Sequence, residues 1–228
     1  GIRDAQESRG LGDVYKRQIL IDLQRKDNLL SMLLFAILAL LVFQFAMGKE
    51  PEMFLTALPG VIWIVTLMSG VLGLGKSFVQ EMESGCMGAL LIAPVDRSVL
   101  FLGKMLANTM FLLLTQLLFV PLCLFIFEID VLSWTGLFLV LLFGTIGFSS
   151  LGTLLTVMTS TVRGKEILLP ILIFPLMVPS LLCVVRLMEN LFFGLHQQEV
   201  WSWWKLLAGF DIVLFTLTIL GFEFVVEE

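Results

Sequence analysis

The stretch MLANTMFLLLTQLLFVPLCLFIF, residues 105–127, contains 23 residues and no charged side chain. A helix rises about 1.5 Å per residue, so about 20 residues cross a hydrocarbon core about 30 Å thick. Further apolar stretches lie on both sides of it, and the charged residues cluster between them. We therefore predict an all-α polytopic membrane protein with six transmembrane helices, at residues 29–47, 57–75, 105–127, 136–158, 167–185 and 206–226.

The composition agrees with a membrane protein. Hydrophobic residues make up 58% of the 228 residues and charged residues 14%, against about 25% charge in a soluble domain. Six spans leave no room for a large soluble domain, and the sequence contains no Walker A loop or glycine-rich dinucleotide turn. We expect no catalytic residue, no resident metal or cofactor and no nucleic-acid partner, so any ATP hydrolysis must come from another subunit.

The first residues differ from the rest of the chain. Residues 1–18 are polar and aperiodic, and we expect a non-native or disordered leader before a single transmembrane domain at 19–228. In residues 18–28, the apolar residues share one helix face and the charged residues fill the other. This pattern fits an N-terminal amphipathic helix on the membrane surface and, equally, an ordinary charged flank of the first span.

Two predicted spans carry distinctive patterns. In residues 136–158, Thr145, Ser149 and Thr153 recur at every fourth position. Small residues on one face allow close helix approach, so we predict that this face packs within the bundle rather than lining a substrate path. The fifth span contains three prolines, which remove backbone donors and predict a kinked or broken, moving helix. They are Pro170, Pro175 and Pro179.

The sixth span contains two carboxylates, Asp211 and Glu223, with 11 uncharged residues between them. A carboxylate at the centre of a span costs about 2.5–3.5 kcal/mol on insertion scales and usually has a partner or a water path. Asp211 is therefore a possible polar site that could pair with Lys205 or Arg186. We slightly favour the alternative, in which Asp211 lies at the interface and caps the start of the helix.

The cationic residues predict an orientation. Seven lysines and arginines lie in the loops on the side of the termini and three on the other side, leaving out residues 1–18. The positive-inside rule then places both termini, and the loops after spans two and four, in the cytoplasm.

The loop after span two is the longest cytoplasmic segment. Residues 76–84 predict a helix with one apolar face, Gly85 ends it, and residues 86–93 form a second run before Pro94. Such a helix–turn–helix is too small to be an enzyme but suits docking of a partner, the alternative being a plain hydrophilic connector. The candidate docking residues are Lys76, Phe78, Glu81, Met82, Glu83 and Gly85.

Two segments in and before this loop resemble a known family. ALPGVIW (residues 57–63) and KSFVQEMESGCMGALLIAPVDRSVLFLGKMLAN (residues 76–108) look like the CcmB family, heme exporter protein B permeases of cytochrome c maturation related to type-2 ABC exporter subunits. The resemblance extends over about residues 19–228. It implies a multi-pass permease subunit in the bacterial inner membrane, with no catalytic activity of its own. The partners it implies are a cytoplasmic ATPase subunit, a tryptophan-rich heme-handling permease, a small membrane subunit and a periplasmic heme chaperone, besides the lipid bilayer.

The resemblance also implies a mechanism. Residues 76–85 would be the coupling helix, with Glu81, Glu83 and Gly85 at its core, and ATP hydrolysis by the partner would drive release of heme-loaded chaperone. Heme is then a handled ligand rather than a bound cofactor. The alternative is a type-2 ABC exporter of another substrate, such as a lipid or polysaccharide. An ion-coupled transporter is disfavoured because spans three to five carry no ionisable acid or base.

Two further features invite a heme-binding interpretation. His196 is the only histidine, and without a second axial candidate we interpret it as a solvated loop residue. The cluster Trp201, Trp203 and Trp204 resembles part of the tryptophan-rich motif of the heme-handling permease but lacks its continuation. We interpret it as an aromatic belt at the membrane interface.

Overall fold

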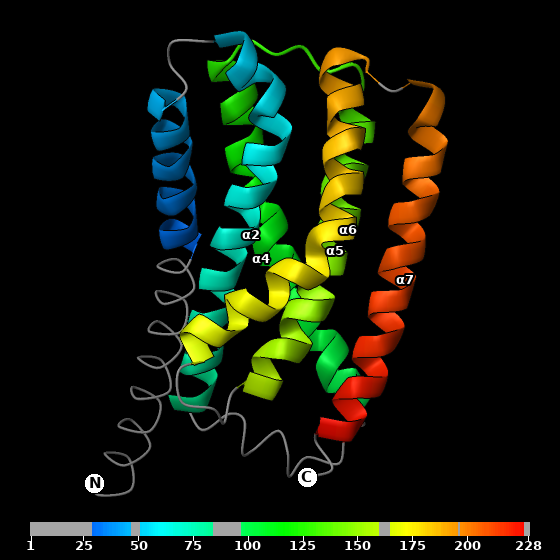
Figure 1. Ribbon diagram of the computed structural model, residues 1–228. Coiled ribbons are helices and arrows are strands. Elements are labelled where there is room, and N and C mark those ends of the chain that lie inside the picture. The colour runs from blue at the N-terminus through cyan, green and yellow to red at the C-terminus, as the bar shows by residue number, and fades with distance from the viewer. Residues whose placement is uncertain (1–28, 47–50, 84–96, 160–164, 196, 226–228) are drawn as a thin grey trace, which may run out of the picture.

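The computed structural model describes residues 29–46, 51–83, 97–159, 165–195 and 197–225. A first helix, Leu29–Ala46, is followed by α2 (Pro51–Glu83), α4 (Arg97–Ile126), α5 (Trp134–Thr159), α6 (Lys165–Phe193), the 3-10 turn η1 (Gln197–Glu199) and α7 (Val200–Val225). The helices run alternately up and down in a bundle (Figure 1). The start of the first helix and the end of α7 therefore point towards the same end of the bundle.

The six-span prediction is confirmed for the described part of the chain. Its candidate spans are Leu29–Ala46, Leu55–Gly75, Leu102–Ile126, Trp134–Thr159, Ile167–Phe193 and Val200–Gly221. Hydropathy and length are sufficient to predict the spans, because a helix is the simplest structure that satisfies every backbone donor and acceptor inside lipid. The protein is thus a multi-pass, all-helical membrane protein.

Two boundaries differ from the prediction. The sixth span begins at Val200 rather than residue 206, because the tryptophan cluster already lies in the first two turns of α7. The fifth continues to Phe193 rather than ending at residue 185. At about 1.5 Å per residue its 27 residues would reach about 40 Å, more than a hydrocarbon core.

A bend in α6 accommodates this extra length. Pro170, Pro175 and Pro179 all lie inside the helix, each removing one i to i−4 hydrogen bond. Figure 1 shows the N-terminal, proline-containing part of α6 (yellow) lying across the bundle before the helix turns alongside α5. The predicted kink is therefore present, although the helix is not broken.

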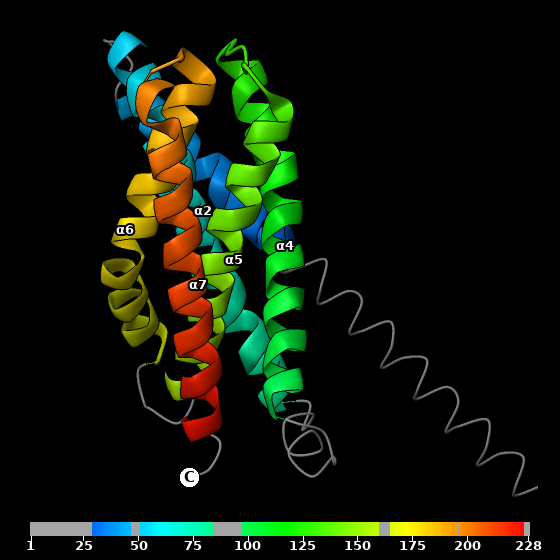
Figure 2. The same cartoon turned by 90° about the vertical axis from the view of Figure 1, so that its right-hand side faces the viewer.

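Helix α5 is the centre of the bundle and contacts α2, α4, α6 and α7. In Figure 2 it lies behind α7 and beside α4. Its glycines permit close approach: the indole of Trp63 lies where a Cβ on Gly144 would be, and Leu74 occupies the same place at Gly152. Side chains of α2 thus pack directly on the α5 backbone, in the manner typical of membrane helices.

The α4–α5 turn is held in place from two sides. Ser133 accepts a hydrogen bond at 3.1 Å from the backbone N–H of Gly136 and so caps α5. The backbone N–H of Leu132 donates to the carbonyl of Leu191 at 2.9 Å. The loop is therefore tied to the end of α6.

Several expectations fall outside the described residues. These are the leader at 1–18, the amphipathic segment at 18–28, and Gly85 with the second helix at 86–93.

Candidate functional site

The predicted coupling segment is a direct extension of α2. Lys76, Phe78, Glu81, Met82 and Glu83 all lie on the helical backbone, which continues from Pro51 without a break. The apolar span ends at Gly75, so eight residues, about 12 Å of helix, extend beyond it. Movement at the tip of this rod would be transmitted directly into the second span.

A polar seam joins α4 to α5. The Nδ2 of Asn108 donates to the Oγ1 of Thr153 at 2.9 Å, and the Oγ1 of Thr145 donates to the Oε1 of Gln116 at 2.9 Å. Eight residues separate the two bonds on each helix, as expected for one antiparallel register. Ser149 lies midway, fully buried, and its hydroxyl has no hydrogen-bond partner.

The seam confirms that the Thr145, Ser149 and Thr153 face packs in the bundle. Its partners on α4, Asn108 and Gln116, were not singled out from the sequence. They are the two amide side chains of the third span, and their spacing of eight residues, which places them on one helix face, could have identified them.

Small cavities lie between the first helix, α2 and α4, beside the seam residues of α4. One of about 10 Å³ is lined by Ala36, Thr66, Ser69, Leu112, Thr115, Gln116 and Phe119, and the Nε2 of Gln116 is buried without a partner. A second, of about 20 Å³, shares Leu112 and lies beside Asn108. Each has room for about one water molecule. Neither could accept a porphyrin, since ligand pockets usually measure about 300–1,000 Å³.

Asp211 is not a helix cap, so the interpretation that we favoured from the sequence is wrong. It lies 11 residues after the start of α7 at Val200 and is 6% exposed. The cap was inferred from a span beginning at residue 206, and the earlier start moves Asp211 into the helix interior. Within the part of the chain that the structure describes, neither carboxyl oxygen has a hydrogen-bond partner.

The basic residues considered as partners of Asp211 do not pair with it. The Nη1 of Arg186 donates to the Oε2 of Glu189 at 2.9 Å, and Lys205 is exposed. Instead, Asp211 faces α5, where a Cβ on Gly147 would collide with its Oδ1.

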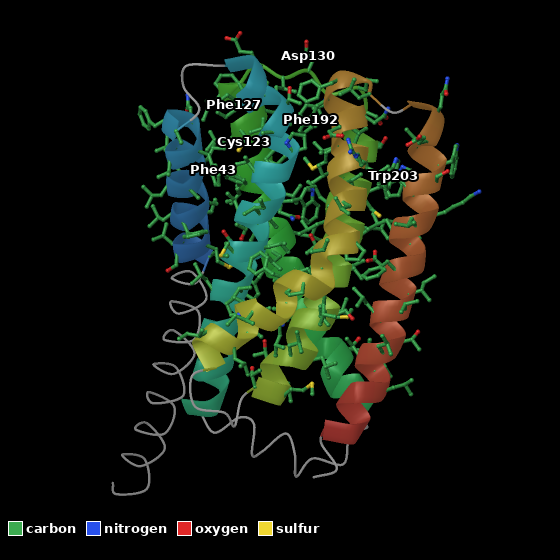
Figure 3. All side chains as sticks on the ribbon, viewed as in Figure 1. Phe43, Cys123, Phe127, Asp130, Phe192 and Trp203 are labelled. Atoms are coloured by element: carbon green, nitrogen blue, oxygen red, sulfur yellow. The ribbon has the colours of Figure 1, made fainter. Side chains whose placement is uncertain are left out.

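The tryptophans at the start of α7 lie in different environments. Trp201 is 77% exposed, which suits a residue at a membrane interface. Trp203 packs against the core that contains Phe192, and both lie near the same end of the bundle (Figure 3). Trp204 meets the ring of Phe143 edge-on, with centroids 6.0 Å apart. The belt interpretation therefore fits Trp201 better than its neighbours.

No group of three or more His, Cys, Asp and Glu side chains that could hold a metal ion occurs among the described residues. His196 lies outside them. The two cysteines in the spans, Cys123 and Cys183, are buried and unpaired.

Comparison with known proteins identifies relatives along most of the chain. A sequence profile of the CcmB protein family matches residues 10–227. Heme exporter protein B of Haemophilus influenzae is 25% identical over 177 residues, covering 78% of this chain and 80% of the relative. Heme exporter protein B of Pseudomonas aeruginosa is 29% identical over 195 residues, 86% of each chain. The protein of the same name from Rhodobacter capsulatus is 28% identical over 158 residues.

Proposed function

The chain belongs to the CcmB protein family, and from this premise we propose that it is the membrane permease subunit of an ABC-type complex for heme delivery in c-type cytochrome biogenesis. The main support is the family match over residues 10–227, together with relatives named heme exporter protein B. The six helices long and apolar enough to cross a membrane also support a membrane subunit.

ATP hydrolysis in this proposal takes place in a cytoplasmic partner subunit, because the chain contains no nucleotide-binding motif. The eight residues of α2 beyond Gly75 form the docking rod. Glu81 and Glu83 offer negative charge to a basic rim, and Phe78 and Met82 offer apolar contacts to a groove. In the sequence, Gly85 is the last residue of the proposed docking segment.

The movement of the ATPase subunit is transmitted to the bundle through α2. A partner shifts a conformational equilibrium only by its different affinity for the two states, so the rod must fit one nucleotide state of the ATPase better than another. Displacement of α2 acts on α5, because Trp63 and Leu74 pack on the backbone at Gly144 and Gly152. The bent helix α6 also contacts α2 and α5, and its three missing hydrogen bonds make it the easiest span to deform.

The remaining partners follow from the family. We propose a tryptophan-rich heme-handling permease and a small membrane subunit in the same bacterial inner membrane, and a heme chaperone on the periplasmic side. Both termini and the segment after α2 then lie in the cytoplasm, as the distribution of lysine and arginine indicates. Heme is the handled ligand, and release of heme-loaded chaperone is the step driven by ATP.

Charge reversal in the docking rod tests this proposal. Glu81→Lys should abolish co-purification of the ATPase subunit and cytochrome c maturation while leaving membrane insertion intact. Glu128→Lys is the matched control, because Glu128 is an exposed carboxylate in the α4–α5 turn at the other end of the bundle. Equal recovery of ATPase with Glu81→Lys, Glu128→Lys and the unaltered chain would contradict the docking assignment. Loss of ATPase with cytochrome c maturation unaffected would favour a type-2 ABC exporter of another substrate.

A further inference from the structure

Asp211 is the one buried carboxylate or basic side chain among the residues whose burial the structure describes. It lies 11 residues after Val200 and 10 before Gly221, the two ends of the apolar span. At about 1.5 Å per residue this places Asp211 about 15 Å from either end, near the middle of the apolar span. An ionisable group at this depth is expensive and typically functional.

The described residues around Asp211 provide no counter-charge. Helix α5 has no titratable residue between Trp134 and Thr159, and it presents Gly147 to the carboxyl. On α6, the buried thiol of Cys183 lies within electrostatic range of Asp211, while Arg186 is bonded to Glu189. Helix α4 packs near α7 through apolar side chains, including Met105.

Other groups on the packed helices lie elsewhere. Lys205 is exposed on α7 itself. Lys165 and Glu166 begin α6, Arg97 and Lys104 lie in the first turns of α4, and Glu223 lies near the end of α7. Lys205 is six residues, about 9 Å of helix, before Asp211, and the others lie near the ends of their helices.

These neighbours decide which ligand the carboxyl can take. An ionised, unpaired carboxylate in an apolar interior costs several kcal/mol or more. A divalent ion would need about six oxygen ligands, whereas Gly147 and Cys183 contribute no side-chain oxygen. A proton removes the charge without any further ligand. We propose that Asp211 is a proton-binding site at the membrane centre, holding its proton while α6 and α7 are packed on α5.

This assignment links the proton to movement of α6. Pro179 cannot donate to the carbonyl of Pro175, and the hydroxyl of Ser180 is buried without a partner. Ser180 lies one turn before Cys183, so this weakened part of α6 adjoins the carboxyl. Because ionised Asp211 requires water, loss of its proton must favour separation of α6 and α7 from α5. The inference rests on this geometry and holds for any transported substrate.

Carbodiimide labelling of the full-length chain in membranes tests whether Asp211 is protonated. Dicyclohexylcarbodiimide reacts with a protonated carboxyl: the acid proton moves to a carbodiimide nitrogen, the carboxyl oxygen bonds to the central carbon, and nothing leaves. We expect labelling at Asp211 at neutral pH, read by peptide mass spectrometry, and its loss in Asp211→Asn. Faster labelling by a water-soluble carbodiimide, or protection by sodium ions at constant pH, would overturn the proposal.

Infrared spectroscopy covers the case in which the reagent cannot reach the site. The spectrum of the wild type minus that of Asp211→Asn should contain the carbonyl band of a protonated carboxylic acid. Absence of both the band and the labelling would refute the proton assignment.

Alkylation of Cys183 by a maleimide tests the link to movement. In chains carrying Cys86→Ser and Cys123→Ala, the ratio of the wild-type rate to the Asp211→Asn rate should rise with pH, because ionisation opens the junction only in the wild type. Ionised Asp211 also disfavours the nearby Cys183 thiolate and so lowers the wild-type rate, and a rise in the ratio therefore reports opening of the junction. A ratio that does not change with pH would contradict the link.

Discussion

The packing of Trp63 on Gly144 predicts the effect of a single methyl group. In Gly144→Ala, the new Cβ would lie inside the volume of the indole ring of Trp63. Trp63 cannot easily move away, because it is 1% exposed and its Nε1 donates to the sulfur of Met188 at 2.8 Å. Inserting volume into a well-packed core costs about 1–3 kcal/mol.

A matched substitution separates this clash from helix propensity. Gly60 also lies inside a span, and a Cβ there would meet no atom of another helix within 4 Å. Gly60→Ala should therefore leave the chain as stable as the wild type or stabilise it by up to about 1 kcal/mol, the propensity difference between the two residues. Both variants receive the same propensity gain, so their difference in unfolding free energy reports the clash, about 1–3 kcal/mol.

Reversible unfolding in mixed detergent micelles would measure both variants. The background Trp63→Phe provides a further check, because the smaller ring leaves room for the methyl group. In that background Gly144→Ala should lose most of its penalty. The reasoning would be refuted if Gly144→Ala were as stable as Gly60→Ala, or if its penalty persisted beside the smaller ring.

Two further outcomes are expected. A double-mutant cycle with Asn108→Leu and Thr153→Val should give a coupling of about 0.6 kcal/mol in unfolding free energy. The coupling should not exceed about 1.7 kcal/mol, the largest value for hydrogen bonds between membrane helices. Zero coupling would show that the 2.9 Å bond contributes nothing to stability. His196→Ala should leave cytochrome c maturation near the wild-type level, and an inserted but inactive variant would instead indicate a ligand role for His196.

The sequence predicts the spans well, because insertion into lipid depends on local properties. Length and hydropathy place the third span at residues 105–127, against Leu102–Ile126 in the structure. The prolines of α6 predict its bend for the same reason, since each acts on its own turn. The repeat of small residues on α5 also identifies a packed face.

The environment of Asp211 depends on tertiary structure and could not be read from its neighbours in sequence. The start of α7 at Val200 moves the residue inward, and Gly147, 64 positions earlier, provides the space for its carboxyl. Similarly, Gln116 is an ordinary polar residue in an apolar run until its register with Thr145 is known. The docking role of residues 76–85 remains a prediction.

Labelling of the native thiol Cys86 tests the central claim most directly. Cys86 lies three residues beyond the end of α2, and Asp130→Cys adds an exposed thiol in the α4–α5 turn at the other end of the bundle. A membrane-impermeant maleimide applied to intact cells should label the new thiol and reach Cys86 only after the inner membrane is permeabilised, with Cys86→Ser as the blank. Labelling of Cys86 from outside intact cells would place the docking rod on the side away from ATP and contradict the account.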